Sequence, residues 1–142
     1  MKILQVVFVS VLLTAMMGCQ TTKVLKKTAS SRANSLEASV SAYRKALRWG
    51  YFEDAALYIR SQDGSSIPVD LDRVKRYRVT SYSISRQILA DTNDIARVNA
   101  QIEYYELDSG IALLLNDVQQ WWYDVKEERW YLGSPLPAFG RR

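Results

Sequence analysis

The spacing of apolar residues changes once along this chain, near Tyr77, and that change limits the folds the chain can adopt. Before Tyr77 the apolar residues recur every three or four positions, which is the period of one face of an α-helix. After Tyr77 they alternate with polar residues, as in a β-strand with one buried face. The pattern predicts an α+β domain. We expect two or three N-terminal helices packed on a curved, four-stranded antiparallel meander sheet.

The first helix is expected to begin near Asn34, which can cap it, with Glu37 completing a capping box. Gly50 is placed to end this helix. The flanking Trp49 and Phe52 are expected to hold the corner to the core, although a ligand contact is an alternative for this pair. The apolar face of the helix would consist of Leu36, Val40, Tyr43 and Leu47.

Two further segments can be helical before the strands begin. Residues 51–59 repeat the helical spacing and predict a second helix. Residues 68–76 are ambiguous, because they fit either a loop or a short helix capped by Asp70.

Four strands are expected from Tyr77 onward, at residues 77–89, 95–107, 111–125 and 129–132. Neither face of the first strand is cleanly apolar, so we expect a β-bulge near Arg86. The inner face of the second strand would carry Ala96, Val98, Ala100, Ile102 and Tyr104. In the third strand Trp121 and Trp122 must point to opposite faces, so both faces are expected to be at least partly covered.

The N-terminus has the pattern of a secretory signal peptide. Met1-Lys2 is followed by the apolar residues 3–17, which as a helix would span about 22 Å, short of the roughly 30 Å of a bilayer core. Gly18-Cys19 then opens a polar segment. Together these features resemble the lipobox of bacterial lipoproteins, although the two methionines before Gly18 depart from its usual residues. The resemblance implies cleavage before Cys19 and lipidation of its sulfur.

The lipobox resemblance also implies a location in the cell envelope. Gln20 follows the cysteine, which by similarity to enterobacterial sorting favours the periplasmic face of the outer membrane. Residues 20–33 are polar and rich in basic side chains, so they would form a tether that is either solvated or in contact with anionic headgroups. The expected organisation is a signal peptide at 1–18, the lipidated cysteine and tether at 19–33, one domain at 34–137 and a C-terminal tail at 138–142.

Composition argues against several classes of function. The chain has no histidine and one cysteine, which lipidation would occupy, so the commonest general base, thiol nucleophile and transition-metal ligands are missing. The net charge of +4 is too modest for a typical nucleic-acid-binding domain. We therefore expect no cofactor, metal or nucleic-acid partner. The acids left for carboxylate chemistry are expected to be outward charges or turn caps; they are Glu103, Glu106, Asp117 and Asp124.

The order of elements, the helical pair "AYRKALRWGYFEDAALYI" and the closing hairpin "QQWWYDVKEERWYL" resemble the NTF2-like and cystatin-like group of α+β folds. The resemblance covers about residues 34–137 and extends to small NTF2-like lipoproteins of Gram-negative envelopes. It implies a cone between sheet and helices, which in catalytic members holds a ligand beside Asp–His or Tyr–Asp pairs. Because this chain has no histidine and no Gln-x-Val-x-Gly hairpin, the resemblance carries over no catalytic residue.

Two functions follow as expectations. The first is a non-enzymatic accessory domain anchored through Cys19 that contacts an envelope protein through exposed aromatic side chains. These contact candidates are Tyr105, Trp121 and Tyr123, which could equally cover a helix layer. The second is a carrier of a small hydrophobic ligand, whose pocket would be lined by Tyr82, Tyr104, Trp122 and Trp130 unless these rings fill the core instead.

Overall fold

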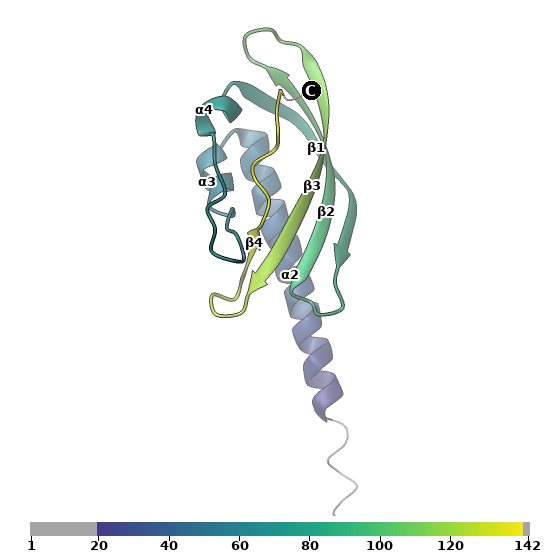
Figure 1. The fold of residues 1–142 in the computed structure, drawn as a ribbon. Coiled ribbons are helices and arrows are strands. Elements are labelled where there is room, and N and C mark those ends of the chain that lie inside the picture. Colours follow the sequence, from purple (N-terminus) through teal and green to yellow (C-terminus); the bar gives the residue numbers. More distant parts are fainter. Residues whose placement is uncertain (1–19, 141–142) are drawn as a thin grey trace, which may run out of the picture. The chain divides into compact units, whose positions relative to one another are not determined.

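The computed structural model describes residues 20–140 and contains a helical layer and one antiparallel sheet (Figure 1). Its helices are α2 (Gln20–Trp49), α3 (Phe52–Ala56) and α4 (Leu71–Val74). Its strands are β1 (Tyr77–Leu89), β2 (Ile95–Glu106), β3 (Ala112–Asp124) and β4 (Arg129–Leu132). The sheet order β1-β2-β3-β4 is a simple meander, and the predicted α+β class is confirmed. Contacts divide the chain into Met1–Ser31 and the compact unit Arg32–Arg142, which carries the core and the hollows described below.

Helix α2 begins at Gln20, so the predicted start near Asn34 is wrong. The sequence between Gln20 and Trp49 contains no glycine or proline, and nothing in it forces the backbone out of the helix. Asn34 and Glu37 are therefore interior residues rather than a capping box. Cys19 and the signal segment lie outside the described residues.

The predicted apolar face of α2 is confirmed, because Leu36, Val40, Tyr43 and Leu47 are all fully buried. Gly50 ends the helix with a φ of 76°, a left-handed conformation that glycine adopts without a side-chain clash. Phe52 then enters the core, as expected. Trp49 does not: its side chain is 64% exposed, so only one of the two aromatic residues anchors the corner.

The ambiguous segment before β1 forms a single helical turn, α4. The Asp70 side chain caps it by accepting a hydrogen bond of 3.0 Å from the backbone N–H of Arg73. Val74, on the inner side of this turn, is fully buried. The short-helix alternative is therefore the correct one.

The sheet register explains why β1 lacks a clean apolar face. The pairing of β1 with β2 shifts between Val79 and Ser81 and again between Ile84 and Arg86. The second shift confirms the bulge predicted near Arg86, whereas the first was not predicted. Each shift changes which side chains point inward. In β2 the predicted inner face is confirmed by the burial of Ala96, Val98, Ala100, Ile102 and Tyr104.

The two adjacent tryptophans of β3 lie on opposite faces, as predicted. Trp121 is fully buried on the inner face, with its ring 5.6 Å from the Tyr43 ring of α2 and 5.9 Å from the Tyr58 ring. Trp122 lies on the outer face and is half-buried beside Tyr131 of β4. The strand therefore contributes the Trp121 ring to the core and the Trp122 ring to the outer face of the sheet.

The C-terminal segment completes the core, so the predicted boundary at residue 137 is wrong. Phe139 is 1% exposed, and its ring lies 4.8 Å from the Tyr104 ring and 5.7 Å from the Tyr77 ring. Arg73 fixes the backbone there by donating a hydrogen bond of 2.8 Å to the Phe139 carbonyl. A short polar segment with one aromatic residue gives too little pattern to reveal this from the sequence.

Among the described residues, no helix is both long enough and apolar enough to cross a membrane.

Replacing Phe139 by alanine should lower the free energy of unfolding by about 3–5 kcal/mol, the usual cost of removing a fully buried phenylalanine ring. Urea unfolding followed by tryptophan fluorescence measures this change. Trp49→Ala, which removes an exposed ring, is the control and should change the stability by no more than about 0.5 kcal/mol. Equal stability of Phe139→Ala and the wild type would show that the segment does not belong to the core.

Candidate functional site

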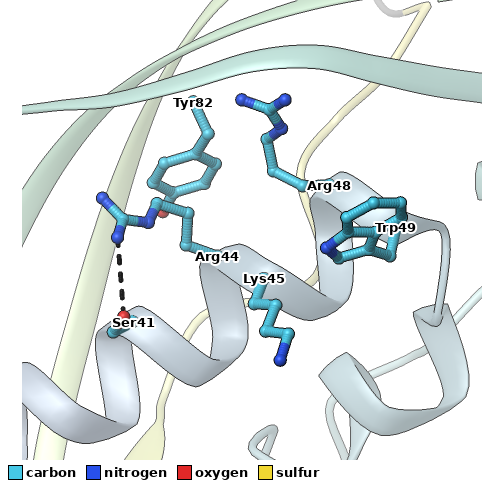
Figure 2. A pocket seen from close by; sticks show the side chains of 6 residues that line it. All are labelled: Ser41, Arg44, Lys45, Arg48, Trp49 and Tyr82. Carbon is cyan, nitrogen blue, oxygen red and sulfur yellow. Dashed lines mark hydrogen bonds between the residues drawn. The ribbon is translucent and has the colours of Figure 1, made fainter.

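A hollow of about 400 Å³ lies between the C-terminal half of α2 and strand β1. We call it the α2–β1 hollow; it is lined by Ser41, Arg44, Lys45, Arg48, Trp49 and Tyr82. Its volume falls in the range of about 300–1,000 Å³ that is typical of small-molecule sites. In Figure 2 the guanidinium groups of Arg44 and Arg48 lie on the side of α2 that faces Tyr82, whereas Lys45 points away.

The positions of the two arginines follow from the helix period. Arg44 and Arg48 are four residues apart, so they lie one above the other on the same flank of α2. This flank adjoins the buried face that carries Tyr43 and Leu47, so packing of that face places the arginines at the edge of the sheet. Arg48 in the last helical turn is also favoured there by the helix dipole.

Among the described residues, Arg44, Lys45 and Arg48 form no ion pair with a carboxylate. The ion pairs of this part of the chain involve Arg60, Arg73 and Lys75 instead. Arg44 donates only a long hydrogen bond of 3.5 Å, to the Ser41 hydroxyl. The α2–β1 hollow is therefore a concentration of positive charge that no carboxylate within residues 20–140 neutralises by an ion pair.

Beneath the hollow lies a buried polar cluster centred on Gln119, which is 1% exposed. The Trp121 indole N–H donates a hydrogen bond of 3.1 Å to Gln119 Oε1. An indole can only donate, so the carbonyl oxygen of Gln119 must face it. The amide nitrogen then faces the other way and donates to the Tyr82 hydroxyl at 2.6 Å and to Asp117 Oδ2 at 2.7 Å.

This arrangement determines what the Tyr82 hydroxyl can do. Because its oxygen accepts from Gln119, its hydrogen is left to point elsewhere. Tyr82 is also one of the side chains that line the α2–β1 hollow, where Arg44 faces its ring (Figure 2). The hydroxyl can therefore donate a hydrogen bond, and burial raises the pKa of Tyr82, so the phenol keeps its proton at neutral pH.

Asp117 is the acidic member of the cluster. It is half-buried on the inner face of β3, and burial raises the pKa of its carboxyl, an effect only partly offset by the hydrogen bond from Gln119. The Tyr43 hydroxyl is fully buried and has no hydrogen-bond partner among the described residues. Burial, followed by the nearby charge of Asp117, raises the pKa of Tyr43 well above its ordinary value. Two phenols and one carboxyl thus share a weakly hydrated region.

The four residues predicted to line a hydrophobic pocket do not come together around one cavity. Tyr104 and Trp130 are buried in the core, and Tyr82 is buried except where it meets the hollow. Trp130 donates hydrogen bonds from its indole to the backbone oxygen of Arg32 and to Ser35, which lock it against α2. Trp122 lies on the opposite face of the sheet. The Tyr104 and Trp130 rings belong to the core cluster, and the alternative that these rings fill the cone stays a prediction.

The predicted contact residues are also separated. Trp121 is 0% exposed and belongs to the core, so it cannot serve as an exposed contact. Tyr123 is half-buried on the inner face between the Trp130 ring and the Arg32 guanidinium, which lies 4.8 Å from the centre of its ring. Tyr105 is half-buried near the end of β2.

Several residues of this site were not singled out from the sequence. Asp117 was expected to point outward or to cap a turn, but its parity with Trp121 places it on the inner face. Asp124 does cap the following turn, accepting from the backbone N–H groups of Lys126 and Glu127. The four-residue spacing of Arg44 and Arg48 was a readable signal, whereas the role of Gln119 depends on cross-strand contacts.

No group of three or more potential metal-ligating side chains occurs within residues 20–140. The α2–β1 hollow offers basic side chains and one phenol, which suit an anion rather than a metal ion.

One solved structure among the comparisons with known proteins supports the fold. No protein-family profile matches the chain, and no curated protein matches it. Among solved structures, a ketosteroid isomerase-like protein from Erwinia carotovora atroseptica is similar, with a TM-score of 0.51 and 13% identity over 71% of this chain and 90% of that chain. The intermembrane space region of the chloroplast protein ARC6 has a TM-score of 0.40 and 11% identity over 72% of this chain and 92% of that chain. The fold is NTF2-like.

Asp117→Asn should raise the stability of the protein at pH 7 relative to pH 4. Burial raises the pKa of Asp117 in the folded state, so above the ordinary carboxyl pKa of about 4 the unfolded chain ionises more readily than the folded chain. Wild-type stability therefore falls as the pH rises towards the folded-state pKa, and asparagine removes this contribution.

Urea unfolding of both proteins at pH 4 and pH 7 measures the effect. The quantity to compare is the stability difference between Asp117→Asn and wild type at the two pH values. Asp108→Asn in the exposed β2–β3 hairpin is the control. A stability difference between Asp117→Asn and wild type that is the same at both pH values would show that Asp117 ionises as freely in the folded chain as in the unfolded one.

Proposed function

We propose that the domain binds a small anionic ligand, such as a carboxylate or phosphate, in the α2–β1 hollow. The observation that carries this proposal is the pair of arginines on one flank of α2, which have no carboxylate partner in the described part of the chain, beside a protonated tyrosine hydroxyl. Arginine binds carboxylate and phosphate groups through charge-assisted hydrogen bonds, which are about twice as strong as neutral ones. Tyr82 would donate a further hydrogen bond, and the proposed role is binding without chemical conversion.

An anion fits this geometry better than the hydrophobic ligand expected from the sequence. A hydrophobic carrier needs an apolar cavity, but the rings expected to line one, Tyr104 and Trp130, are packed in the core together with Phe139. The exposed Trp49 ring borders the α2–β1 hollow and would favour an anion that also carries a flat or apolar part.

Arg44→Met and Arg48→Met should each weaken anion binding by about tenfold, because each removes one charge-assisted hydrogen bond. The full 142-residue chain can be purified in a neutral polyoxyethylene detergent and titrated with inorganic phosphate, citrate and benzoate. The readout is the shift of the Trp49 indole resonance in nitrogen–proton correlation spectra.

Arg86→Met is the matched control, since Arg86 is an exposed arginine on β1 that does not line the hollow. Its titration should equal that of the wild type. The proposal fails if none of the three anions moves the Trp49 resonance at millimolar concentration, or if all three variants bind equally well.

We further propose that the protein is a lipoprotein held at the periplasmic face of the outer membrane through Cys19. The support for this location is the sequence alone. It consists of the charged start, the short apolar segment, Gly18-Cys19 and the change to polar residues that follows. One diacylglycerol and one N-acyl group together would give stable anchoring, which a single chain does not.

Contact with another envelope protein is the second candidate role. The side chains that favour it lie on and beside the β2–β3 hairpin, where Leu107, Ile111 and Leu114 are between 47% and 60% exposed. Exposed apolar side chains that cluster on one part of a surface often mark protein contacts.

Cys19→Ser should abolish lipid attachment and leave the protein unprocessed or soluble. Metabolic labelling with palmitate and fractionation of envelopes measure the two effects. Wild-type levels of label and of membrane association in the serine variant would refute the lipoprotein assignment.

A further inference from the structure

A second surface of the domain, on the outer face of the sheet, has the form of a binding site that the α2–β1 hollow does not involve. Two adjoining hollows of about 310 Å³ and 470 Å³ have Ser61, Gln62 and Trp122 in common among their lining residues. The first is completed by Ile95 and Gln120 of the sheet and by Gly133, which directly follows β4. The second lies under the loop that joins α3 to α4. We call the pair the Trp122 hollows.

The Trp122 ring is held in one orientation at this surface. Its indole N–H donates a hydrogen bond of 2.7 Å to the backbone oxygen of Arg60. Its ring packs against the Tyr131 ring of β4, with centroids 5.4 Å apart and planes inclined by 33°. The indole donor is therefore already used, and what Trp122 presents to the hollows is ring surface.

The start of the loop between α3 and α4 is also held in place by several contacts. Arg60 donates from its backbone N–H to the Leu132 oxygen at 3.0 Å, and Leu132 donates to Tyr58 at 2.7 Å. The Arg60 guanidinium lies 4.4 Å from the centre of the Tyr131 ring and 2.7 Å from Glu127 Oε1. In Figure 1 this segment, between α3 and α4, passes beside β4. The loop thus begins from a fixed point before it extends over the Trp122 hollows.

The remaining lining combines the apolar residues Ile59, Ile67 and Ile95 with hydrogen-bonding groups, and it includes Arg60, whose guanidinium is paired with Glu127. Asp63 Oδ1 accepts from the Ser65 backbone N–H at 2.9 Å and from the Ser61 hydroxyl, and these hydrogen bonds lower the pKa of Asp63 to about 2. Its carboxylate is consequently ionised and oriented, with Oδ2 left as an acceptor. The side-chain amides of Gln62 and Gln120 are exposed, and each offers one acceptor and two donor hydrogens.

Gly133 keeps the first hollow open. A Cβ at this position would lie 3.4 Å from Trp122 Cδ1 and 3.5 Å from the Gln120 backbone oxygen. Alanine would therefore just touch the indole, and a branched side chain would occupy the space beside it. The absence of a positive φ at Gly133 means that its backbone conformation does not itself require glycine.

We propose that the Trp122 hollows bind a neutral carbohydrate. The C–H face of a sugar ring would pack on the exposed surface of the Trp122 ring, and its hydroxyls would pair with the Asp63 carboxylate and the Gln62 and Gln120 amides. A ligand with many hydroxyls, each both a donor and an acceptor, matches a lining of amides, serine hydroxyls and one carboxylate. Asp63 disfavours an anion, since the one cation of the lining among the described residues, Arg60, is already paired with Glu127 and Asp124. A wholly apolar ligand would leave the polar groups unpaired. The proposal is independent of anion binding at the α2–β1 hollow.

The test uses the full chain in a detergent without a sugar headgroup, titrated separately with maltose, cellobiose and N,N′-diacetylchitobiose. We expect at least one disaccharide to shift the Trp122 indole resonance at millimolar concentration and to leave the Trp49 resonance unchanged. Gly133→Val should abolish the shift by filling the space beside the indole. Asp63→Asn should weaken binding by about tenfold, the usual effect of losing one hydrogen bond to a charged group.

Trp49→Leu is the matched control, because it removes an exposed indole that borders the other hollow. It should bind the disaccharide as the wild type does. Urea unfolding shows whether each variant is folded, and Gln120→Ala, which alters only an exposed side chain, replaces any variant that is not. The proposal is overturned if no disaccharide moves the Trp122 resonance, or if folded Gly133→Val and Asp63→Asn or Gln120→Ala bind as tightly as the wild type.

Discussion

The contact between the apolar stripe of α2 and the inner face of the sheet is the interaction on which the rest of the domain depends. Leu36, Val40, Tyr43 and Leu47 are fully removed from water by it, and Tyr43 meets Trp121 edge to face. A helix fixed by one face has its other faces fixed as well, because rotation would expose the stripe. Arg44 and Arg48 are therefore held at the edge of the sheet by residues that never touch a ligand themselves.

Strand β3 connects the two surfaces that we associate with binding. Along its last part, Gln119 and Trp121 point inward to the polar cluster under the α2–β1 hollow, whereas Gln120 and Trp122 point outward to the Trp122 hollows. Alternation of side chains along a strand makes this separation unavoidable. Each indole N–H is used internally, by Gln119 on one face and by the Arg60 backbone on the other, so both rings act as fixed walls.

The helix-to-strand order, the α2 stripe, the β2 inner face and the opposed tryptophans could all be predicted, because periodicity alone determines them. The length of α2 could not, since Asn34 and Glu37 fit a capping box equally well as exposed interior residues. Phe139 escaped prediction because burial of a terminal segment depends on the space left by Tyr77 and Tyr104. The Gln119 cluster likewise depends on which side chains are in contact across strands, and these contacts cannot be predicted from the sequence.

The two register shifts in β1 affect how readily another copy of the chain can add a strand to its open edge. Strand β4 is covered on its outer side by the bridge from Ile59, but among the described strands β1 pairs only with β2 and leaves one backbone edge open. The shifts divide this long edge into three short runs, none as long as the roughly six residues that cross-β stacking requires. Irregular edges of this kind hinder strand-to-strand addition. The same irregularity that turns Tyr82 towards the hollow thus also makes the β1 edge a poor template for the strand of another copy.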